Sequence, residues 1–377
     1  MMIDHGIKYF GTAQEHSALM PRLLNQFERV ILSGQSLQGP DVNEFEENIK
    51  NLVSRKYGVA VGSCTDALYF SLLAIGIKPN DEVVVPSFTF IASASCISRT
   101  GATPIFCDVD ENGSASPASV KNLITEKTKA VIYVHMFGYY DWDNYKKVFD
   151  LCKTAGVCLI EDAAQAFGAN YAREMAGGRG AVSCFSFDPT KVIAAPGSGG
   201  IILTDDENIH LHCRALRYHG KNYAGKFLEL GFNSQMPSLT AAILNLKLEY
   251  NDEWRTKRIN IARMYIDQLS DLPLLLPPAP DGTKHIYHKF VIRLKMRDKL
   301  KDFLAQKNIQ SLIHYETPLP EVPIFALSKL ASHYENSLQL TREVLSLPCH
   351  PFLMESEVSY ICKCIREFFS LRPANTA

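Results

Sequence analysis

Residues 157–166 read V-C-L-I-E-D-A-A-Q-A, an apolar run that ends in two adjacent carboxylates. This pattern predicts a buried strand over residues 157–162 with Asp162 at its carboxyl end. Four earlier runs of the same apolar kind lie at residues 58–61, 82–86, 103–109 and 130–135. Helix-spaced segments separate several of the runs, at residues 65–75, 91–99 and 143–154. Strands that are apolar on both faces and alternate with helices predict a mostly parallel α/β sheet covered on both sides.

The pattern changes after residue 182. Two apolar runs, 182–187 and 199–204, are separated by a loop too short for a helical crossover. They are expected to pair antiparallel or to lie far apart in the sheet. After Pro237, one long amphipathic helix is predicted, with an apolar stripe formed by Leu239, Ile243, Leu246, Tyr250 and Trp254.

A second, smaller unit is expected towards the C-terminus. A proline-rich stretch at residues 272–282 marks a connection, and it is followed by a predicted strand at 286–294 and a helix at 297–308. We therefore expect a large α/β domain over residues 1–260, including an N-terminal helical arm, and a small α+β domain over residues 261–377.

Composition excludes several classes of protein. The 377 residues are 46% apolar, and 39 basic against 40 acidic side chains give a net charge of −1. This balance disfavours a nucleic-acid-binding protein. The ten cysteines include no CxxC pair, so reduced thiols, no metal site and a cytoplasmic location are expected. No apolar stretch approaches the roughly 18 residues of a membrane span, so no membrane association is expected.

Candidate chemistry lies where the strands end, because ligands of open α/β sheets bind beyond the carboxyl ends. Asp162 closes a buried strand, where a carboxylate is costly unless it meets a cation. The alternative is that Asp162 caps a following helix. Lys191 follows S-F-D-P-T and precedes the glycine-rich turn 196–200. As an alternative, Lys191 is an ordinary solvated surface charge.

The segment G-S-C-T-D-A-L at residues 62–68 follows a strand and opens a helix. Free N–H groups at such a helix start can bind a phosphate. Ordinary helix capping by Ser63 or Thr65 is the alternative. The glycine-rich pieces 177–180 and 197–200 each precede a strand, so neither is a dinucleotide fingerprint.

Taken together, the motifs resemble the pyridoxal-phosphate-dependent sugar aminotransferases of the DegT/StrS type. The resemblance rests on E-D-A-A-Q-A (161–166), S-F-D-P-T-K (186–191), G-S-G-G (197–200) and G-S-C-T-D-A-L (62–68). Further matches are P-S-F-T-F-I-A (86–92), V-H-M-F-G (134–138), L-R-Y-H-G (216–220) and F-N-S-Q-M-P-S-L-T-A-A-I (232–243). Together they span nearly the whole chain. The resemblance implies the aspartate-aminotransferase fold, a PLP-dependent transferase architecture with a large and a small domain.

The resemblance also implies roles for individual residues. Lys191 would form the Schiff base with pyridoxal phosphate, and Asp162 would pair with the pyridinium nitrogen. Gln165 would reach the ring hydroxyl, and Phe90 would stack on the ring. The residues implied around the phosphate are Ser63, Cys64, Thr65, Ser186 and, from a neighbouring subunit, Asn233. Because Asn233 would reach the cofactor of a neighbouring subunit, the resemblance also implies a homodimer with shared active sites. The candidate substrate contacts are His135, His314 and Tyr315.

The implied reaction is transamination of a nucleotide-linked 3-keto or 4-keto-6-deoxy sugar (dTDP, GDP or UDP). L-glutamate would be the amino donor and pyridoxamine phosphate the intermediate cofactor form. The product would enter lipopolysaccharide, capsule or glycoside biosynthesis. One alternative is a sugar deoxygenase, a class that has histidine at the lysine position. The other is a non-catalytic regulatory protein, which would be expected to lose Lys191 or Asp162.

Three departures from the family pattern leave the substrate subclass open. Ser198 stands where the family usually has an acidic residue, and Cys64 stands where a glycine is common. The segment Pro318-Leu319-Pro320 lacks the histidine of the family's P-L-H segment.

Overall fold

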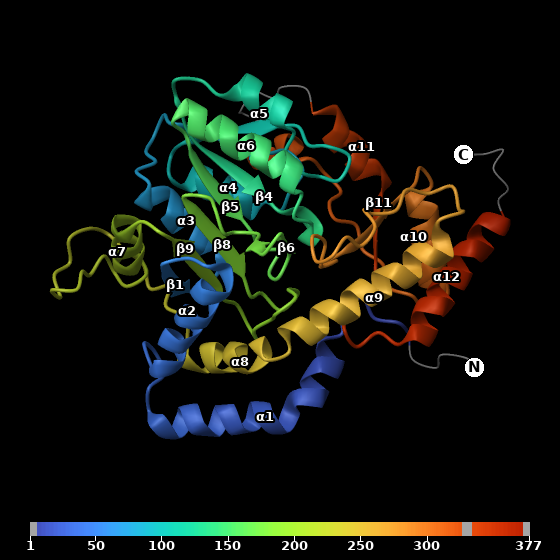
Figure 1. The fold of residues 1–377 in the computed structure, drawn as a ribbon, viewed down its shortest axis with the longest axis horizontal. Coiled ribbons are helices and arrows are strands. Elements are labelled where there is room, and N and C mark those ends of the chain that lie inside the picture. Colours follow the sequence, from blue (N-terminus) through green and yellow to red (C-terminus); the bar gives the residue numbers. More distant parts are fainter. Residues whose placement is uncertain (1–5, 326–333, 372–377) are drawn as a thin grey trace.

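The computed structural model describes residues 6–325 and 334–371. Its centre is a seven-stranded sheet with the order β1-β9-β8-β5-β4-β2-β3 (Figure 1). The strands are β1 (Tyr57–Val61), β2 (Glu82–Pro86), β3 (Thr103–Cys107), β4 (Thr128–Val134), β5 (Cys158–Asp162), β8 (Val182–Ser186) and β9 (Gly200–Thr204). All neighbouring pairs from β8 to β3 are parallel, whereas β9 runs antiparallel to both β8 and β1. The mostly parallel sheet and the antiparallel pairing of 182–187 with 199–204 are confirmed.

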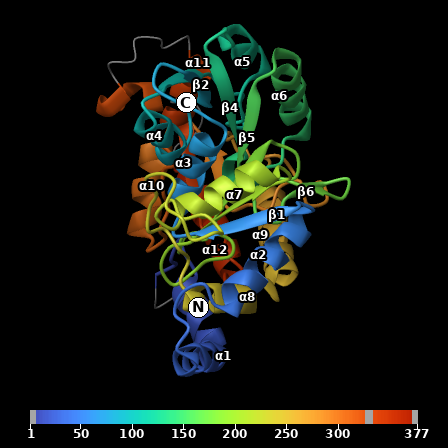
Figure 2. The ribbon, with the colours of Figure 1, turned by 90° about the vertical axis from the view of Figure 1, so that its left-hand side faces the viewer.

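Helices cover both faces of this sheet, as Figures 1 and 2 show. They are α2 (Pro40–Val53), α3 (Cys64–Ala74), α4 (Ala92–Arg99), α5 (Pro117–Leu123), α6 (Trp142–Ala155), α7 (Glu207–Leu216) and α8 (Ser238–Leu248). Along β2, Val83 and Val85 enter the core with α3 and α4, whereas Val84 enters the core with α6. Alternate side chains of one strand therefore fill two apolar cores, which is why the strand is an unbroken apolar run.

Two helices follow Pro237, so the prediction of one continuous helix there is wrong. α8 ends at Leu248, and α9 (Asn251–Leu269) begins after a turn in which the N–H of Tyr250 donates to Lys247 O. Asp252 and Glu253 lie in the first turn of α9, where carboxylates favour a new helix start.

The C-terminal unit packs around its own apolar core. Its elements are α9, β10 (Phe290–Arg293), α10 (Arg297–Gln306), β11 (Val344–Leu347) and α12 (Glu355–Ser370). By contrast, α11 (Glu335–Glu343) places Leu340 in the core formed with α3 and α4, and the N–H groups of Asn336 and Ser337 donate to Asp108. β10 pairs antiparallel with β11. β10 is shorter than the predicted strand because Ile286 and Lys289 donate instead to backbone carbonyls of residues 138 and 137. The predicted boundary at residue 260 falls inside α9, so the division into domains stays a prediction.

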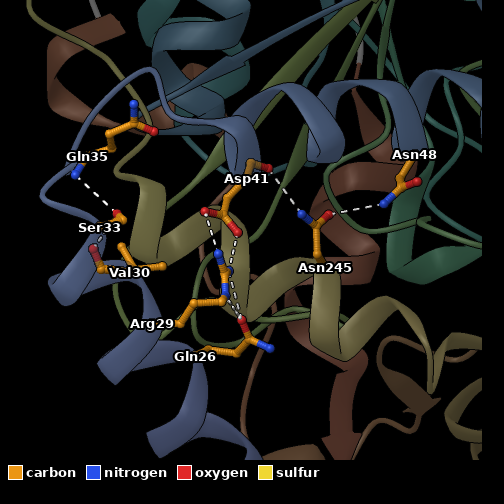
Figure 3. A network of polar contacts seen from close by, with 8 residues as sticks. All are labelled: Gln26, Arg29, Val30, Ser33, Gln35, Asp41, Asn48 and Asn245. Atoms are coloured by element: carbon orange, nitrogen blue, oxygen red, sulfur yellow. Dashed lines mark hydrogen bonds and ion pairs between the residues drawn. The ribbon is translucent and has the colours of Figure 1, made fainter.

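The N-terminal helix α1 (Thr12–Ser33) lies along α8 at one end of the molecule (Figure 1). Arg29 of α1 pairs with Asp41 of α2, and Asn245 of α8 donates a 3.1 Å hydrogen bond to Asp41 O (Figure 3). Lys247 of α8 is fully buried and lies 2.5 Å from the carboxylate of Glu15. These polar contacts hold the arm against the large unit.

The remaining elements are short. They are β6 (Asn170–Tyr171), β7 (Glu174–Met175), and the 3-10 turns η1 (Met136–Gly138), η2 (Leu319–Glu321) and η3 (Pro323–Phe325).

Candidate active site

Asp162 lies at the carboxyl end of β5 and is 4% exposed. Its Oδ2 accepts a hydrogen bond of 2.7 Å from Ser93 Oγ, and its Oδ1 accepts one of 3.2 Å from Ala164 N–H. Burial raises the pKa of Asp162, while Ser93, Ala164 and the nearby Lys191 act in the opposite direction. No helix begins behind β5, because residues 163–169 form turns. The helix-cap alternative for Asp162 is therefore wrong.

Lys191 sits in the turn between β8 and β9, where its N–H donates to Asp188 O at 2.9 Å. Asp188 also accepts from the N–H and the hydroxyl of Thr190, which shapes the turn. Burial lowers the pKa of the Lys191 amine, and the thiol of Cys64 and the carboxylate of Asp162 counteract this effect. The side chain lines the same cavity as Asp162, so Lys191 is not an ordinary surface charge.

The start of α3 forms a second wall of this cavity. Ser63 Oγ accepts from Asp66 N–H at 3.1 Å, so Ser63 does cap the helix. The N–H groups of Cys64 and Thr65 lie in the first turn and have no acceptor within the helix, so they remain available to an anion. A Cβ at Gly200 would lie 2.6 Å from Cys64 N, so only glycine lets β9 pass beneath this turn. Capping and anion binding are thus compatible here.

Gln165, Tyr315 and Phe90 form the remaining wall. Gln165 Oε1 accepts from Phe137 N–H at 3.2 Å, and Gln165 Nε2 lies 3.3 Å from the Tyr315 hydroxyl. The rings of Phe90 and Tyr315 are 6.2 Å apart, and Phe90 is 54% exposed at the rim. His314 Nδ1 is 2.9 Å from Ser346 Oγ, and burial together with nearby lysines lowers the His314 pKa to about 3.

The cavity has a volume of about 330 Å³, within the range of small-molecule sites. Ten of the residues predicted from sequence line it: Ser63, Cys64, Thr65, Phe90, Asp162, Gln165, Ser186, Lys191, His314 and Tyr315. Residues from segments more than 200 positions apart thus converge at the strand ends.

Two predicted site residues lie elsewhere. His135 is fully buried, and its Nε2 is 2.8 Å from Glu161 Oε2. It does not line the cavity, so its position does not support the predicted substrate contact. Asn233 is exposed in the loop before α8, and its Oδ1 accepts from Gln235 Nε2 at 3.2 Å. Its predicted role towards a neighbouring subunit stays a prediction.

Sequence reasoning missed Ser93 and Lys289. Ser93 lies in α4 and bonds Asp162 although 69 positions separate the two residues. Lys289 precedes β10 and lines the cavity beside Lys191. Only its position as a lysine within the predicted strand 286–294 could have drawn attention to Lys289, and nothing local marks Ser93.

The residues present fit pyridoxal phosphate. Within residues 6–325 and 334–371, neither Asp162 nor Lys191 forms an ion pair, although both line one cavity. A pyridinium nitrogen would supply the cation that Asp162 lacks, and an aldehyde would meet the amine of Lys191. The free N–H groups of α3 suit the phosphate. Together with the sheet order, this site defines the class: a PLP-dependent transferase of the aminotransferase fold.

The chain belongs to the DegT/DnrJ/EryC1/StrS aminotransferase family, which it matches over residues 19–366. This family depends on pyridoxal phosphate. The solved structure of DesV from S. venezuelae, in complex with a ketimine intermediate, superposes with a TM-score of 0.92 at 31% identity. That match covers 97% of this chain and 98% of DesV.

Curated relatives include enzymes and one protein named for regulation. A UDP-N-acetyl-3-dehydro-alpha-D-glucosamine 3-aminotransferase of Acidithiobacillus ferrooxidans is 35% identical over 92% of this chain and 94% of its own. A protein of Geobacillus stearothermophilus named a pleiotropic regulatory protein is 34% identical over 95% of this chain and 97% of its own.

Two further features of the described part of the chain bear on other functions. No helix there is long and apolar enough to cross a membrane. No group of three or more His, Cys, Asp or Glu residues there is arranged to hold a metal ion.

Proposed function

We propose that this protein transfers an amino group from L-glutamate to a nucleotide-linked keto-6-deoxy sugar, using pyridoxal phosphate. The observation that carries the proposal is the placement of Lys191 and Asp162 in one cavity, each without an ionic partner among the described residues. The nucleotide-sugar aminotransferases among its relatives support the substrate class. The keto position, the nucleotide and the use of the product in lipopolysaccharide or glycosides stay predictions.

When bound, pyridoxal phosphate supplies an electron sink for a carbon that loses a proton. The residues of this chain provide the rest. Asp162 would hold a proton on the ring nitrogen, and the amide of Gln165 would orient the ring by binding the ring hydroxyl. The N–H groups of Cys64 and Thr65 bind the phosphate.

Lys191 has two tasks in this proposal. Burial lowers its pKa, so a larger share of the amine is unprotonated and able to attach the cofactor covalently. Once substrate has displaced it, the free Nζ would be the base that takes up the proton from the Cα of the amino donor. In the second half-reaction the same Nζ returns a proton to the sugar carbon that receives the amine.

A homodimer with shared sites completes the proposal. Along α1, Met20, Leu24, Phe27 and Ile31 are exposed at spacings of three and four residues, so they form one apolar stripe. The arm that carries the stripe is tied to the large unit by the Arg29–Asp41 pair (Figure 3). An apolar stripe of this kind suits a second copy of the chain, which would bring its Asn233 to the phosphate. All ten cysteines are free, which supports the predicted cytoplasmic location.

The two alternatives are less well supported. A deoxygenase would have histidine where Lys191 stands. A regulatory protein without catalysis would be expected to lose Lys191 or Asp162, and both residues are present.

The test is a pair of half-reactions on the purified protein. With pyridoxal phosphate and L-glutamate, absorbance should report conversion of the cofactor to its amino form. That form should then aminate one member of a panel of dTDP-, GDP- and UDP-linked keto sugars, with the product identified by mass. Lys191→Ala should lose both steps, and borohydride should fix the cofactor to Lys191 only in the wild type. A colourless protein after incubation with pyridoxal phosphate would overturn the proposal.

A further inference from the structure

Lys289 lies between two cavities. It immediately precedes β10, and its N–H donates to Phe137 O at 3.3 Å, which joins the start of β10 to the turn after β4. The residue is only 5% exposed. It lines both the active-site cavity and a neighbouring cavity of about 310 Å³. A lysine is rarely buried to this degree without a carboxylate partner.

No such partner is present in the described part of the chain. The Nζ of Lys289 lies 2.8 Å from His288 Nε2, and it takes part in no ion pair there. The charged and titratable groups that act on it are Lys191, Arg258, His288, His314 and Asp188. Most of these are bases, and Asp188 is the single carboxylate in that set. A visiting anion would therefore supply the partner that the amine of Lys289 lacks.

The cofactor phosphate is a poor candidate for this anion. Its proposed donors are the N–H groups at the start of α3, whereas Lys289, like His314 and Tyr315, is contributed to the cavity by the C-terminal part of the chain. The amine of Lys289 is thus left for the reacting molecule. Because it lines the same cavity as Lys191, a group bound to it would be held near the reacting carbon.

We propose that Lys289 binds a carboxylate of the substrate, and that this contact positions the reacting carbon at Lys191. The inference rests on the proposed function and adds a specificity-determining residue to it. The carboxylate belongs either to the amino donor or to a sugar acid, and separate half-reactions distinguish these sources.

Binding should be coupled to a proton. Burial, together with Lys191 and Arg258, lowers the pKa of Lys289 well below its ordinary value. The arriving carboxylate favours the ammonium form, so the amine should take up a proton as the charge-assisted hydrogen bond forms. A residue with a purely structural role would not show this proton uptake.

The experiment compares the cofactor-loaded wild type with Lys289→Met, which keeps length and apolar character, and with Lys289→Arg, which keeps a charge. Lys295→Met is the matched control, because Lys295 is exposed and only six positions away. Each half-reaction gives an apparent Kd, for L-glutamate and for the keto sugar. Calorimetric titration with the non-reacting dicarboxylate glutarate, in buffers of different ionisation enthalpy, measures proton uptake.

If Lys289 binds the carboxylate of the amino donor, Lys289→Met should raise the apparent Kd for glutamate at least ~10-fold. The variant should also lose the proton uptake with glutarate, and its sugar half-reaction should be unchanged. Lys289→Arg should recover part of the affinity. If Lys289 instead binds the carboxylate of a sugar acid, the increase in apparent Kd should appear only in the sugar half-reaction. Wild-type affinities for Lys289→Met in both half-reactions would overturn the inference. A wild type that performs neither half-reaction would instead overturn the proposed function.

Discussion

Ser93 Oγ donates a hydrogen bond of 2.7 Å to Asp162 Oδ2 at the buried end of the active-site cavity. The bond joins α4 to the end of β5, and it favours the ionised carboxylate against the effect of burial. Asp162 can hold a proton on the cofactor ring only while it is ionised itself. If Asp162 pairs with the ring as proposed, Ser93 acts on the reaction through Asp162 and is a positioning residue.

Removing this hydroxyl should weaken the enzyme most at low pH. In Ser93→Ala the pKa of Asp162 rises, because a bond to the charged form is lost, so the acidic limb of the kcat profile should move to higher pH. A hydrogen bond to a charged group contributes about 1.5–3 kcal/mol, so turnover should fall ~10-fold or more. Ser95→Ala on the same helix is the control. An unshifted acidic limb in Ser93→Ala would show that the bond does not tune Asp162.

Replacing the carboxylate itself should have a larger effect. Asp162→Asn keeps the shape and a hydrogen-bonding group but removes the negative charge that keeps the ring nitrogen protonated. We expect turnover to fall at least ~100-fold, or about 2.7 kcal/mol in the barrier, with a smaller loss of cofactor affinity. Steady-state kinetics and cofactor titration measure the two effects. Near-normal turnover would exclude Asp162 as the partner of the ring.

Mixing two inactive variants tests whether sites are shared between subunits. Lys191→Ala and Asn233→Ala should each have low activity alone. If Asn233 serves the neighbouring site, each mixed dimer has one site with both changes and one with neither. Activity should then recover after subunit exchange, up to about half an intact site per dimer, or about a quarter of wild-type activity, because about half of the dimers are mixed. No recovery, with exchange verified by mass and a defect verified in each parent, would place both residues in the same subunit's site.

Glu161, next to Asp162 but directed into the opposite core, should contribute to stability rather than to chemistry. It is fully buried and accepts hydrogen bonds from the N–H groups of Gly177, Arg179 and Gly180 besides its contact with His135. Burial opposes its ionisation, but the hydrogen bonds prevail and lower the pKa of Glu161 from 4.5 to about 2.

A carboxylate with a lowered pKa stabilises the fold above its ordinary pKa, and this contribution is lost as the pH falls from 4.5 towards 2. Glu161→Gln should therefore lower the free energy of unfolding by about 3 kcal/mol at pH 7 and flatten its decline below pH 4.5. Urea unfolding at several pH values measures both effects. The exposed Glu207→Gln is a suitable control. Unchanged stability at pH 7 would contradict the structural role.

The strand positions and most of the site could be derived from the sequence, because their signals are local. An apolar run ending in Asp162, or a turn of proline, threonine and glycine around Lys191, dictates backbone conformation within a few residues. The start of α3 at Cys64 likewise follows from a cap that reaches only three positions ahead. Resemblance to a family then assigned the roles of these residues.

The tertiary structure decided whatever depends on packing between distant segments. It placed His135 in a core beside Glu161, although its position at a strand end suggested the cavity. It brought Ser93 to Asp162 and left Lys289 buried without a carboxylate partner in the described residues. It also ended α8 at Leu248 within an unbroken apolar stripe. Local pattern specifies which residues are apolar or polar, but burial and pairing follow from which elements meet in space, and that is a property of the whole fold.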